Sequence, residues 1–334
     1  MRYTAVTQIP SIAIKQGTIP EGAQITIAIP TYKRTHLLRE TLESCLTQQT
    51  NCPFAIMVVD NNPERECETE QLLREYEAIP YLFYYKNTEN VGMTGNWNKL
   101  FELAQTNFVV MLHDDDMIEE DYIQKVASVI NFYQENITAI YVTSRIFSDK
   151  TNLPQRKQVN NINYISLNPF DFQFYNMICI TGACFKRKII IDIDGFDHFY
   201  YPSADYEMHV RLSYIGKIIK IQTYPLSLYR VSENESMNFN TIIKMIEKDK
   251  VITNNIIKKY SNFYINLFLS YQKNRELSHY IGTKRVFGVN SPEINQKITE
   301  LKNKITFIDK LIFLGWRIFI KLHSILKPKT TIKL

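Results

Sequence analysis

The chain has 334 residues, of which 45% are hydrophobic and 22% are charged, so it can bury a sizeable core and is not a disordered protein. This length suits one large domain or one domain with an appendage. The formal net charge of +5 is small and residues 1–240 contain no basic stripe, so we expect no nucleic-acid partner.

Apolar runs of strand length alternate with helical patterns in the first third of the chain. Residues 1–24 are predicted to be an irregular lead-in. Strands are then predicted over 25–30, 54–60, 81–86 and 108–116, and helices after Thr35, over 64–77 and over 96–105. Alternating strands and helices predict an α/β fold with a parallel sheet covered on both faces, whose ligands bind at the carboxyl ends of the strands.

The second half of the chain is less regular. A helix is predicted over 119–135 and a strand over 139–147, and the polar segment 148–175 is predicted to be an excursion or a lid. The apolar stretches 178–187 and 217–231 flank a polar segment, and helical patterns dominate from about residue 240 onward. We therefore expect three parts: 1–24, a sheet-containing domain over 25–240, and a helical region over 241–334.

Cysteine usage and the N-terminus bear on location. The five cysteines include no CxxC pair, and their spacing fits neither a zinc site nor a disulfide framework, which favours a reducing compartment. The N-terminal residues lack the apolar core of a signal peptide, and no apolar run reaches the length of about 18 residues typical of a membrane span. A cytoplasmic location is the expectation.

Three adjacent carboxylates, Asp114, Asp115 and Asp116, end the strand predicted over 108–116. Neighbouring carboxylates repel one another unless a positive group lies among them. A hard divalent cation, Mn²⁺ or Mg²⁺, is a natural partner, and substrate phosphates would complete its ligand shell. The alternative is a solvated acidic cap of the next helix.

Polar residues also follow the other predicted strands. Tyr32 can stack on a nucleotide base, and Asp60 can accept a hydrogen bond from a base N–H, although residues 60–63 taken alone favour a plain turn. Gly92, between Asn90 and Asn96, permits close approach of the backbone to a ligand, or is an ordinary loop glycine.

Six stretches, in this order and spacing, resemble the family 2 glycosyltransferases of GT-A fold. They are ITIAIPTYKR, MVVDNN, NTENVGMTGNWN, VVMLHDDDMI, ITGACFKRKIIIDIDGFD and SADYEMHVRL, and they cover about residues 25–232. The resemblance implies a GT-A, Rossmann-like, mostly parallel sheet flanked by helices, with a helical C-terminal extension. It further implies a nucleotide-sugar donor, with a leaning to UDP, and a saccharide acceptor or a lipid-linked one.

The resemblance also implies roles for individual residues. Asp205 would be the general base, with Glu207 as the fallback, and a single base opposite the leaving group gives inversion. Asp115 would be the main metal ligand with Asp116 beside it, and His113 falls where the family often has its first Asp. The implied donor-binding residues are Pro30, Thr31, Tyr32, Arg34, Asp60, Asn90, Gly92, Asn96, Asp114 and Arg230.

The sequence departs from the family pattern at Ala204, which replaces an acidic residue, at His209, which replaces a frequent Trp, and at Ser232, which replaces a frequent His. The QxxRW motif of processive synthases is absent, which favours addition of one sugar per encounter. Segments 148–175 and 198–204 are expected to hold the acceptor determinants.

The C-terminal residues 302–334 carry eight Lys and Arg and one acidic residue, Asp309, interleaved with large apolar residues. A basic amphipathic helix of this kind suits a membrane interface, and the alternative is a helix that packs on the catalytic domain with solvated lysines. Membrane contact would suit a lipid-linked acceptor on the cytoplasmic face, as in bacterial capsule or O-antigen synthesis.

Two other functions compete with this one. A nucleotidyltransferase would need a glycine-rich loop after the first strand, and the loop PTYKRTH contains no glycine. A non-catalytic sugar-binding or scaffold protein would tolerate loss of Asp205 and of the acidic run, and both are present.

Overall fold

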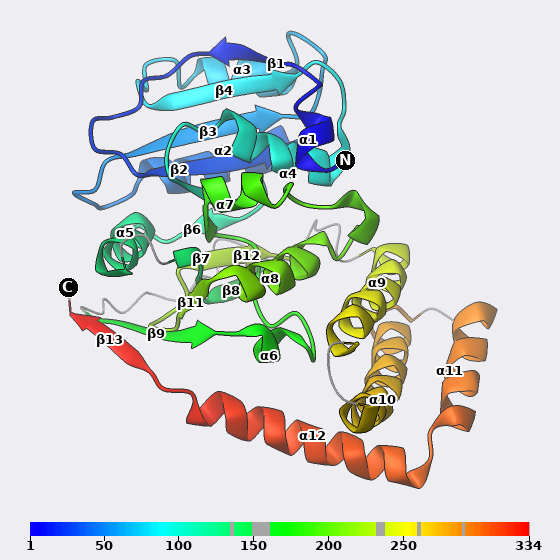
Figure 1. Cartoon of the computed structure of the whole chain (residues 1–334). Coiled ribbons are helices and arrows are strands. Elements are labelled where there is room, and N and C mark those ends of the chain that lie inside the picture. Colours follow the sequence, from blue (N-terminus) through cyan, green and yellow to red (C-terminus); the bar gives the residue numbers. More distant parts are fainter. Residues whose placement is uncertain (134–136, 149–160, 232–237, 259–261, 289–290, 334) are drawn as a thin grey trace.

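The computed structural model describes residues 1–133, 137–148, 161–231, 238–258, 262–288 and 291–333. In this part of the chain one long sheet runs through the molecule and a helical region lies at one end (Figure 1). Its strands, in spatial order, are β1 (Ser11–Lys15), β4 (Leu82–Asn87), β3 (Phe54–Asp60), β2 (Ile25–Thr31), β5 (Phe108–Met111), β10 (Ala183–Lys186), β7 (Ile137–Tyr141), β11 (Lys217–Ile221), β9 (Asn161–Leu167) and β13 (Thr330–Lys333). A smaller sheet contains β6 (Met117–Ile118), β12 (Ser227–Arg230) and β8 (Ser144–Phe147).

The centre of the long sheet is parallel. Strands β4, β3, β2 and β5 pair in parallel, so their carboxyl ends meet at one edge. All residues of β2 are buried, because Ile27 and Ile29 pack on one face of the sheet and Ala28 on the other. Beyond β5 the sheet is mixed: β10 is antiparallel to β5 and β7, and β11 is parallel to β7. The predicted α/β class is confirmed.

Helices cover both faces of the sheet. The face that includes Ile27 packs against α2 (Thr35–Leu46), α3 (Glu68–Arg74) and α5 (Tyr122–Tyr133). The face that includes Ala28 packs against α4 (Gly92–Leu103), α6 (Pro169–Phe172), α7 (Arg187–Asp192) and α8 (Ala204–Ile215). Shorter elements are α1 (Tyr3–Val6) and a 3₁₀ turn over His198–Tyr200.

The region after residue 238 is helical, as predicted, and contains α9 (Phe239–Ile257), α10 (Asn262–Phe287), α11 (Pro292–Lys304) and α12 (Phe307–Leu326). The chain then returns to the sheet, where β13 pairs antiparallel with β9. Within the helical region predicted over 241–334, the last described residues are therefore a strand, because their backbone completes the edge of the sheet.

Three other sequence-based predictions are corrected. The lead-in 1–24 is ordered, since β1 pairs antiparallel with β4 and the Tyr3 amide donates to the Asp194 carbonyl at 3.1 Å. The single strand predicted over 139–147 is two strands, β7 and β8, in different sheets. The strand predicted over 108–116 ends at Met111, and the acidic residues form a turn before β6. These elements are defined by strands distant in the sequence, since β1 pairs with β4, β7 with β11, and β6 and β8 with β12. Local sequence patterns do not reveal such pairings.

The segment 148–175, predicted to be an excursion or lid, contributes β9 to the long sheet and the short helix α6; its residues 149–160 lie outside the described part of the chain, as does Ser232. Within the described residues, no helix combines the length and apolarity that crossing a membrane requires.

Candidate active site

A cavity of about 440 Å³ opens at the carboxyl ends of the parallel strands. Most of the predicted donor-binding residues line it, and they come from the ends of β2 and β5 and from the start of α4. The lining residues are Pro30, Thr31, Tyr32, Arg34, Asn61, Asn90, Gly92, Met93, Asn96, Trp97, His113, Asp114, Asp115 and Tyr201. The topology thus brings residues from five stretches of sequence to one edge, four of which follow the parallel strands, as the strand order predicts.

The acidic turn borders this cavity, and its three carboxylates are buried. Thr31 Oγ1 donates to Asp114 Oδ2 at 2.7 Å. Arg34 Nη1 donates to Asp115 Oδ2 at 2.9 Å and lies 3.6 Å from Asp114 Oδ1. The last residue of β2 therefore supplies a hydroxyl, and Arg34 at the start of α2 supplies a positive charge, to the turn that follows β5.

The inner side of the turn is braced by residues from later in the chain. Asp116 accepts a hydrogen bond from Thr181 Oγ1 and another, at 2.8 Å, from the backbone N–H of Arg230. The Arg230 side chain donates from Nε to the Asp115 carbonyl at 2.8 Å and from Nη2 to Glu40 Oε2 at 2.5 Å. Arg230 thus lies behind the acidic turn and is not among the described residues that line the cavity.

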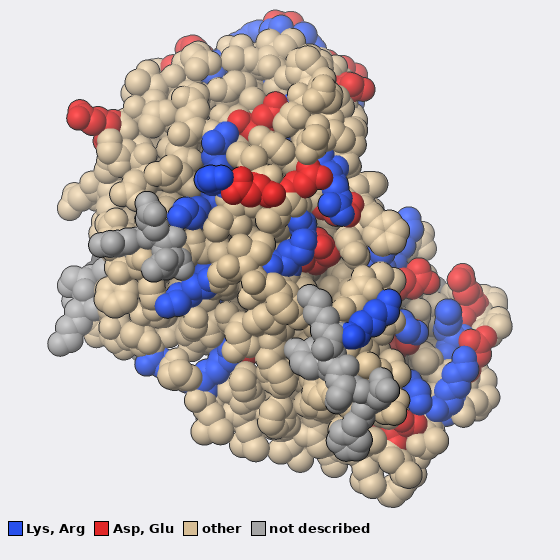
Figure 2. Space-filling model, viewed as in Figure 1, with Lys and Arg blue, Asp and Glu red and all other residues tan. Residues whose placement is uncertain are grey.

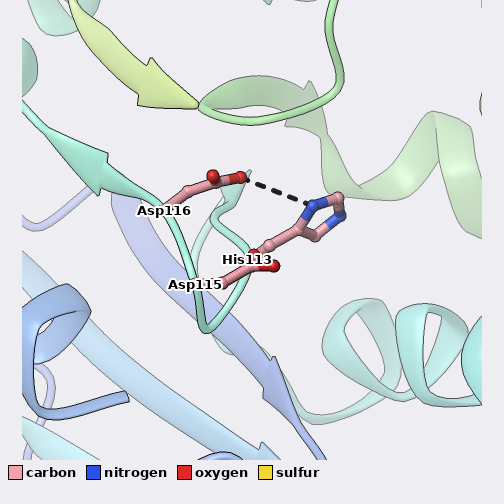
Figure 3. A group of neighbouring side chains, drawn as sticks. All are labelled: His113, Asp115 and Asp116. Carbon is pink, nitrogen blue, oxygen red and sulfur yellow. Dashed lines mark ion pairs between the residues drawn. The ribbon is translucent and has the colours of Figure 1, made fainter. Parts of the chain in front are cut away.

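His113 completes a cluster with two of these carboxylates (Figure 3). One ligand atom from each of His113, Asp115 and Asp116 can be chosen so that all three lie within 4.8 Å of one another. His113 Nδ1 is 3.6 Å from Asp116 Oδ2, and its ring stacks on Trp97 with centroids 5.5 Å apart. Its Nε2 is buried and has no hydrogen-bond partner among the described residues.

Burial shapes the protonation of this cluster. Burial raises the pKa of Asp114 to about 6, and burial with repulsion by Asp115 raises that of Asp116 to about 8. Burial lowers the pKa of His113, which favours the neutral imidazole that ligates metals. Two carboxylates and a neutral imidazole with an unsatisfied buried nitrogen are a donor set that fits a divalent cation such as Mn²⁺.

Asparagine side chains that line the cavity are joined to one another by hydrogen bonds. Asn61 Nδ2 donates to Asn90 Oδ1 at 2.7 Å, and Asn87 Nδ2 donates to both Asn61 Oδ1 and Asn96 Oδ1 at 3.0 and 2.9 Å. Gly92 has a φ of +73°, which side-chain-bearing residues rarely adopt. A Cβ there would meet no atom within 4 Å, so backbone conformation, rather than space, requires the glycine.

Asp60 lies apart from the cavity lining. Its Oδ2 accepts hydrogen bonds from Lys86 Nζ at 2.7 Å and from the Tyr84 hydroxyl at 3.0 Å, and Asp60 and Lys86 are both buried. Asn61, the next residue, lines the cavity instead. We predicted Asp60 to accept a hydrogen bond from a base N–H; in the structure its Oδ2 accepts from Lys86 of β4, and the donor-binding role of Asp60 stays a prediction.

Replacing Lys86 by methionine should lower the free energy of unfolding by roughly 3 to 5 kcal/mol, because it leaves the Asp60 carboxylate buried and uncompensated. Urea denaturation measures this loss. The double variant Asp60→Asn/Lys86→Met should recover part of it, since neither charge remains. Equal loss in the single and double variants would contradict the importance of the ion pair.

Asp205 lies in the first turn of α8. Its Oδ2 accepts a hydrogen bond from Asn176 Nδ2 at 2.8 Å, and Asn176 Oδ1 is 3.1 Å from His209 Nδ1. Burial raises the pKa of Asp205 to about 6, with a further contribution from Asp249. Glu207, the fallback base, forms an ion pair of 2.7 Å with Arg211 instead.

Asp205 is not one of the described residues that line the cavity, but two connections relate it to the site. Tyr201, which precedes α8, lines the cavity. Asn176, the partner of Asp205, and Thr181, the partner of Asp116, belong to one short stretch of chain before β10. Sequence reasoning missed Asn176 and Thr181, whose neighbours carry no charge that would mark them.

A mostly parallel α/β sheet, with a cavity and a buried acidic turn at its carboxyl edge, is the arrangement expected of a GT-A protein. Residues 26–194, half of the chain, match the model of the family described as glycosyl transferase family 2. The chain belongs to this family.

Individual relatives are distant. The chain is 23% identical over 201 residues to glycosyltransferase GlyA of Streptococcus pneumoniae, over 60% of this chain and 25% of GlyA. It is 27% identical over 195 residues to the glucosyl-dolichyl phosphate glucuronosyltransferase of Haloferax volcanii, over 52% of this chain and 56% of that protein. The chain thus spans between 25% and 56% of the length of these curated relatives.

Among solved structures, the crystal structure of S. aureus TarS 1–349 in complex with UDP-GlcNAc is similar, with a TM-score of 0.60 at 15% identity. The match covers 83% of this chain and 79% of the TarS chain. At this identity the likeness establishes a shared fold, and the predicted GT-A architecture is confirmed.

Proposed function

We propose that the protein transfers a sugar from a nucleoside diphosphate sugar, with UDP as the preferred nucleotide, to an acceptor hydroxyl with inversion at the anomeric carbon. The observation that carries this proposal is the buried acidic turn beside a cavity at the carboxyl edge of the sheet. Membership of glycosyl transferase family 2 supports the reaction class.

The donor nucleotide would occupy the cavity. Tyr32 is 45% exposed at the end of β2, where its ring is available to stack on a base. Asn61 and Asn90 offer amide groups for a base edge, and Asp114, held by Thr31, faces the same space for the ribose or sugar. Arg34 lies in this lining and is the nearest described cation to the acidic turn on the cavity side, so it suits the diphosphate.

Asp115 and Asp116, with His113, would hold a divalent cation, Mn²⁺ or Mg²⁺. A bound cation supplies Lewis-acid stabilisation of the charge that develops on the leaving diphosphate. Thr181 and the Arg230 backbone N–H hold the Asp116 carboxylate, and the Arg230 side chain holds the backbone of Asp115 through its carbonyl.

Asp205 acts as the general base in this proposal. Its carboxylate takes the proton of the acceptor hydroxyl while the acceptor oxygen bonds to the anomeric carbon and the bond from that carbon to the diphosphate oxygen breaks. Displacement from the side opposite the leaving group inverts the configuration. The raised pKa of Asp205, about 6, makes it a stronger base than an ordinary aspartate and leaves it ionised at pH 7 to 8.

The acid limb of the kcat profile should report Asp205, so kcat should fall with unit slope below about pH 6. Replacing Asn176 by leucine removes a hydrogen bond that lowers this pKa, while Asp249 and burial still raise it, so the limb should move upward by about one pH unit. Steady-state rates between pH 5 and 9 measure the shift. The exposed change Asn51→Leu is the matched control, and an unmoved limb in Asn176→Leu would contradict the assignment.

The acceptor is proposed to be a saccharide or lipid-linked saccharide at the cytoplasmic face of a bacterial membrane, in surface polysaccharide synthesis. The five cysteines are free thiols, which suits a reducing compartment. Tyr201, from a segment in which we expected acceptor determinants, reaches the cavity and is proposed to contact the acceptor.

Thermal shift with UDP, GDP, CDP and dTDP, each with and without Mn²⁺, tests the donor assignment. We expect UDP with Mn²⁺ to raise the melting temperature more than any of the other three nucleotides. Mn²⁺ and nucleotide should act together, because only a bound nucleotide completes the ligand shell of the cation. Turnover of the matching sugar donor, followed by NMR of the product's anomeric proton, then tests inversion. No stabilisation by any nucleotide would favour the non-catalytic scaffold function.

A further inference from the structure

The outer face of α12 is apolar and exposed. Large side chains recur on it at helical spacing and are between 50% and 73% exposed. These residues are Phe307, Leu311, Leu314, Ile318, Leu322 and Ile325. Positions at these spacings share one face of a helix, so they form one continuous stripe along α12, which we call the apolar stripe.

The apolar stripe is exposed even though α12 is packed against the rest of the protein. The opposite face of α12 packs into the protein through Phe313, Trp316 and Ile320. The Trp316 ring lies 5.0 Å from that of Phe174 and the Phe313 ring 5.3 Å from that of Tyr271, measured between centroids. One face of α12 is therefore buried against the protein, and a second apolar face is exposed.

Both ends of α12 are held. At its start, Asp309 and Thr306 form a capping box, and Asn274 of α10 donates to the Asp309 carbonyl at 3.1 Å. At its end, His323 and Lys327 contact Asp171 of α6, and β13 then pairs with β9. The orientation of the apolar stripe relative to the catalytic sheet is therefore fixed by contacts at both ends of the helix.

Charge on α12 selects the kind of partner. The exposed cations Lys310, Arg317 and Lys321 border the stripe on one side, while the helix's single acidic residue, Asp309, is buried. A second copy docked stripe to stripe would bring cations together without carboxylates from α12 to balance them. Anionic lipid headgroups complement both the cations and the adjacent apolar surface.

We propose that α12 is a membrane-docking surface that lies in the interfacial plane of an anionic bilayer, with its apolar stripe at the boundary between headgroups and acyl chains. Figure 1 shows α12 along one edge of the molecule, and in Figure 2 the same edge is largely tan. Because no described helix is suited to crossing a bilayer, attachment is parallel to the surface. This proposal requires no sugar chemistry and so goes beyond the proposed transferase activity.

Flotation of the full chain with vesicles tests the proposal. Wild type should float with phosphatidylcholine vesicles that contain phosphatidylglycerol, and less with pure phosphatidylcholine or in high salt. The variant Leu311→Ser/Ile318→Ser/Leu322→Ser should reduce the floated fraction at least about tenfold, because it removes apolar area from the stripe. The reversal Lys310→Glu/Arg317→Glu/Lys321→Glu should remove the preference for anionic vesicles.

A matched control replaces three exposed apolar residues elsewhere, Phe132→Ser/Ile146→Ser/Val286→Ser, and should float like wild type. Circular dichroism of each variant confirms that it folds, and nucleotide-dependent thermal shift should be unchanged in the stripe variant. Equal flotation of the stripe variant and wild type overturns the proposal. The proposal is also overturned if wild type does not float but forms a dimer that the stripe substitutions dissociate. That result would identify a second copy of the chain as the partner of the stripe.

Discussion

Replacing Asp205 by asparagine should lower kcat at pH 8 by about 10³-fold, because the acceptor hydroxyl then has no base to take its proton. Donor affinity should stay nearly constant, since Asp205 does not line the cavity that we assign to the donor. Asparagine keeps the shape of the side chain and can still accept the hydrogen bond from Asn176. Rates with saturating donor and acceptor, together with donor binding by calorimetry, separate the two effects.

The same substitution should stabilise the fold at pH 8. The pKa of Asp205 in the folded chain, about 6, lies above that of an unfolded aspartate, so the contribution of this carboxyl to stability is present at low pH and is lost as pH rises through 6. The Asp205→Asn variant would avoid that loss, raising the free energy of unfolding at pH 8 by about 1 to 3 kcal/mol and changing it little at pH 4.

The change Glu207→Gln is the matched control, because it neutralises a nearby carboxylate of the same helix that pairs with Arg211. It should leave kcat within an order of magnitude of wild type. If Asp205→Asn and wild type hydrolyse and transfer at equal rates, Asp205 is not the base, and a scaffold function gains support.

Replacing Asp115 by asparagine should abolish stimulation by Mn²⁺ and lower turnover by at least about 10²-fold. Asp115 is buried in the cluster with His113 and Asp116, and its Oδ2 lies 2.9 Å from Arg34 Nη1, nearer than the Asp114 carboxylate at 3.6 Å. Titrating Mn²⁺ against donor turnover and against the UDP-dependent thermal shift measures the loss. Both signals should fail together, because both depend on one cation.

An exposed aspartate serves as the control for this prediction. Asp192 pairs with Lys188 at the surface, and Asp192→Asn should leave the Mn²⁺ titration unchanged. A titration curve for Asp115→Asn that matched wild type would place the cation elsewhere.

The central strands could be predicted because their sequences are continuously apolar. Strand β3 begins and ends at the predicted residues, 54 and 60, since a run buried on both sheet faces has sharp polar boundaries. Strands β1 and β13 were missed because they are short edge strands whose residues are partly polar. Only their pairing with β4 and β9 makes them strands, and such pairing is a tertiary property.

The site shows the same division. The predicted residues at the end of the first strand, together with Asp114 and Asp115 of the acidic turn, converge on the cavity because strand ends in a parallel sheet share an edge. Asp60 and Arg230 could not be placed from sequence, because their partners Lys86 and Glu40 lie 26 and 190 residues away. Local composition identifies a charged residue at a strand end. It does not identify the residue with which that side chain forms its ion pair, because the partner is brought there by the tertiary fold.

The stretch that carries both Asn176 and Thr181 has a consequence for engineering. On the proposed function it supports the base through one residue and a cation ligand through the other. Libraries that exchange this loop to alter which sugar is accepted would also disturb handling of the donor, so selectivity and turnover would change together. Keeping these two positions constant while varying the residues between them is the way to uncouple the two properties.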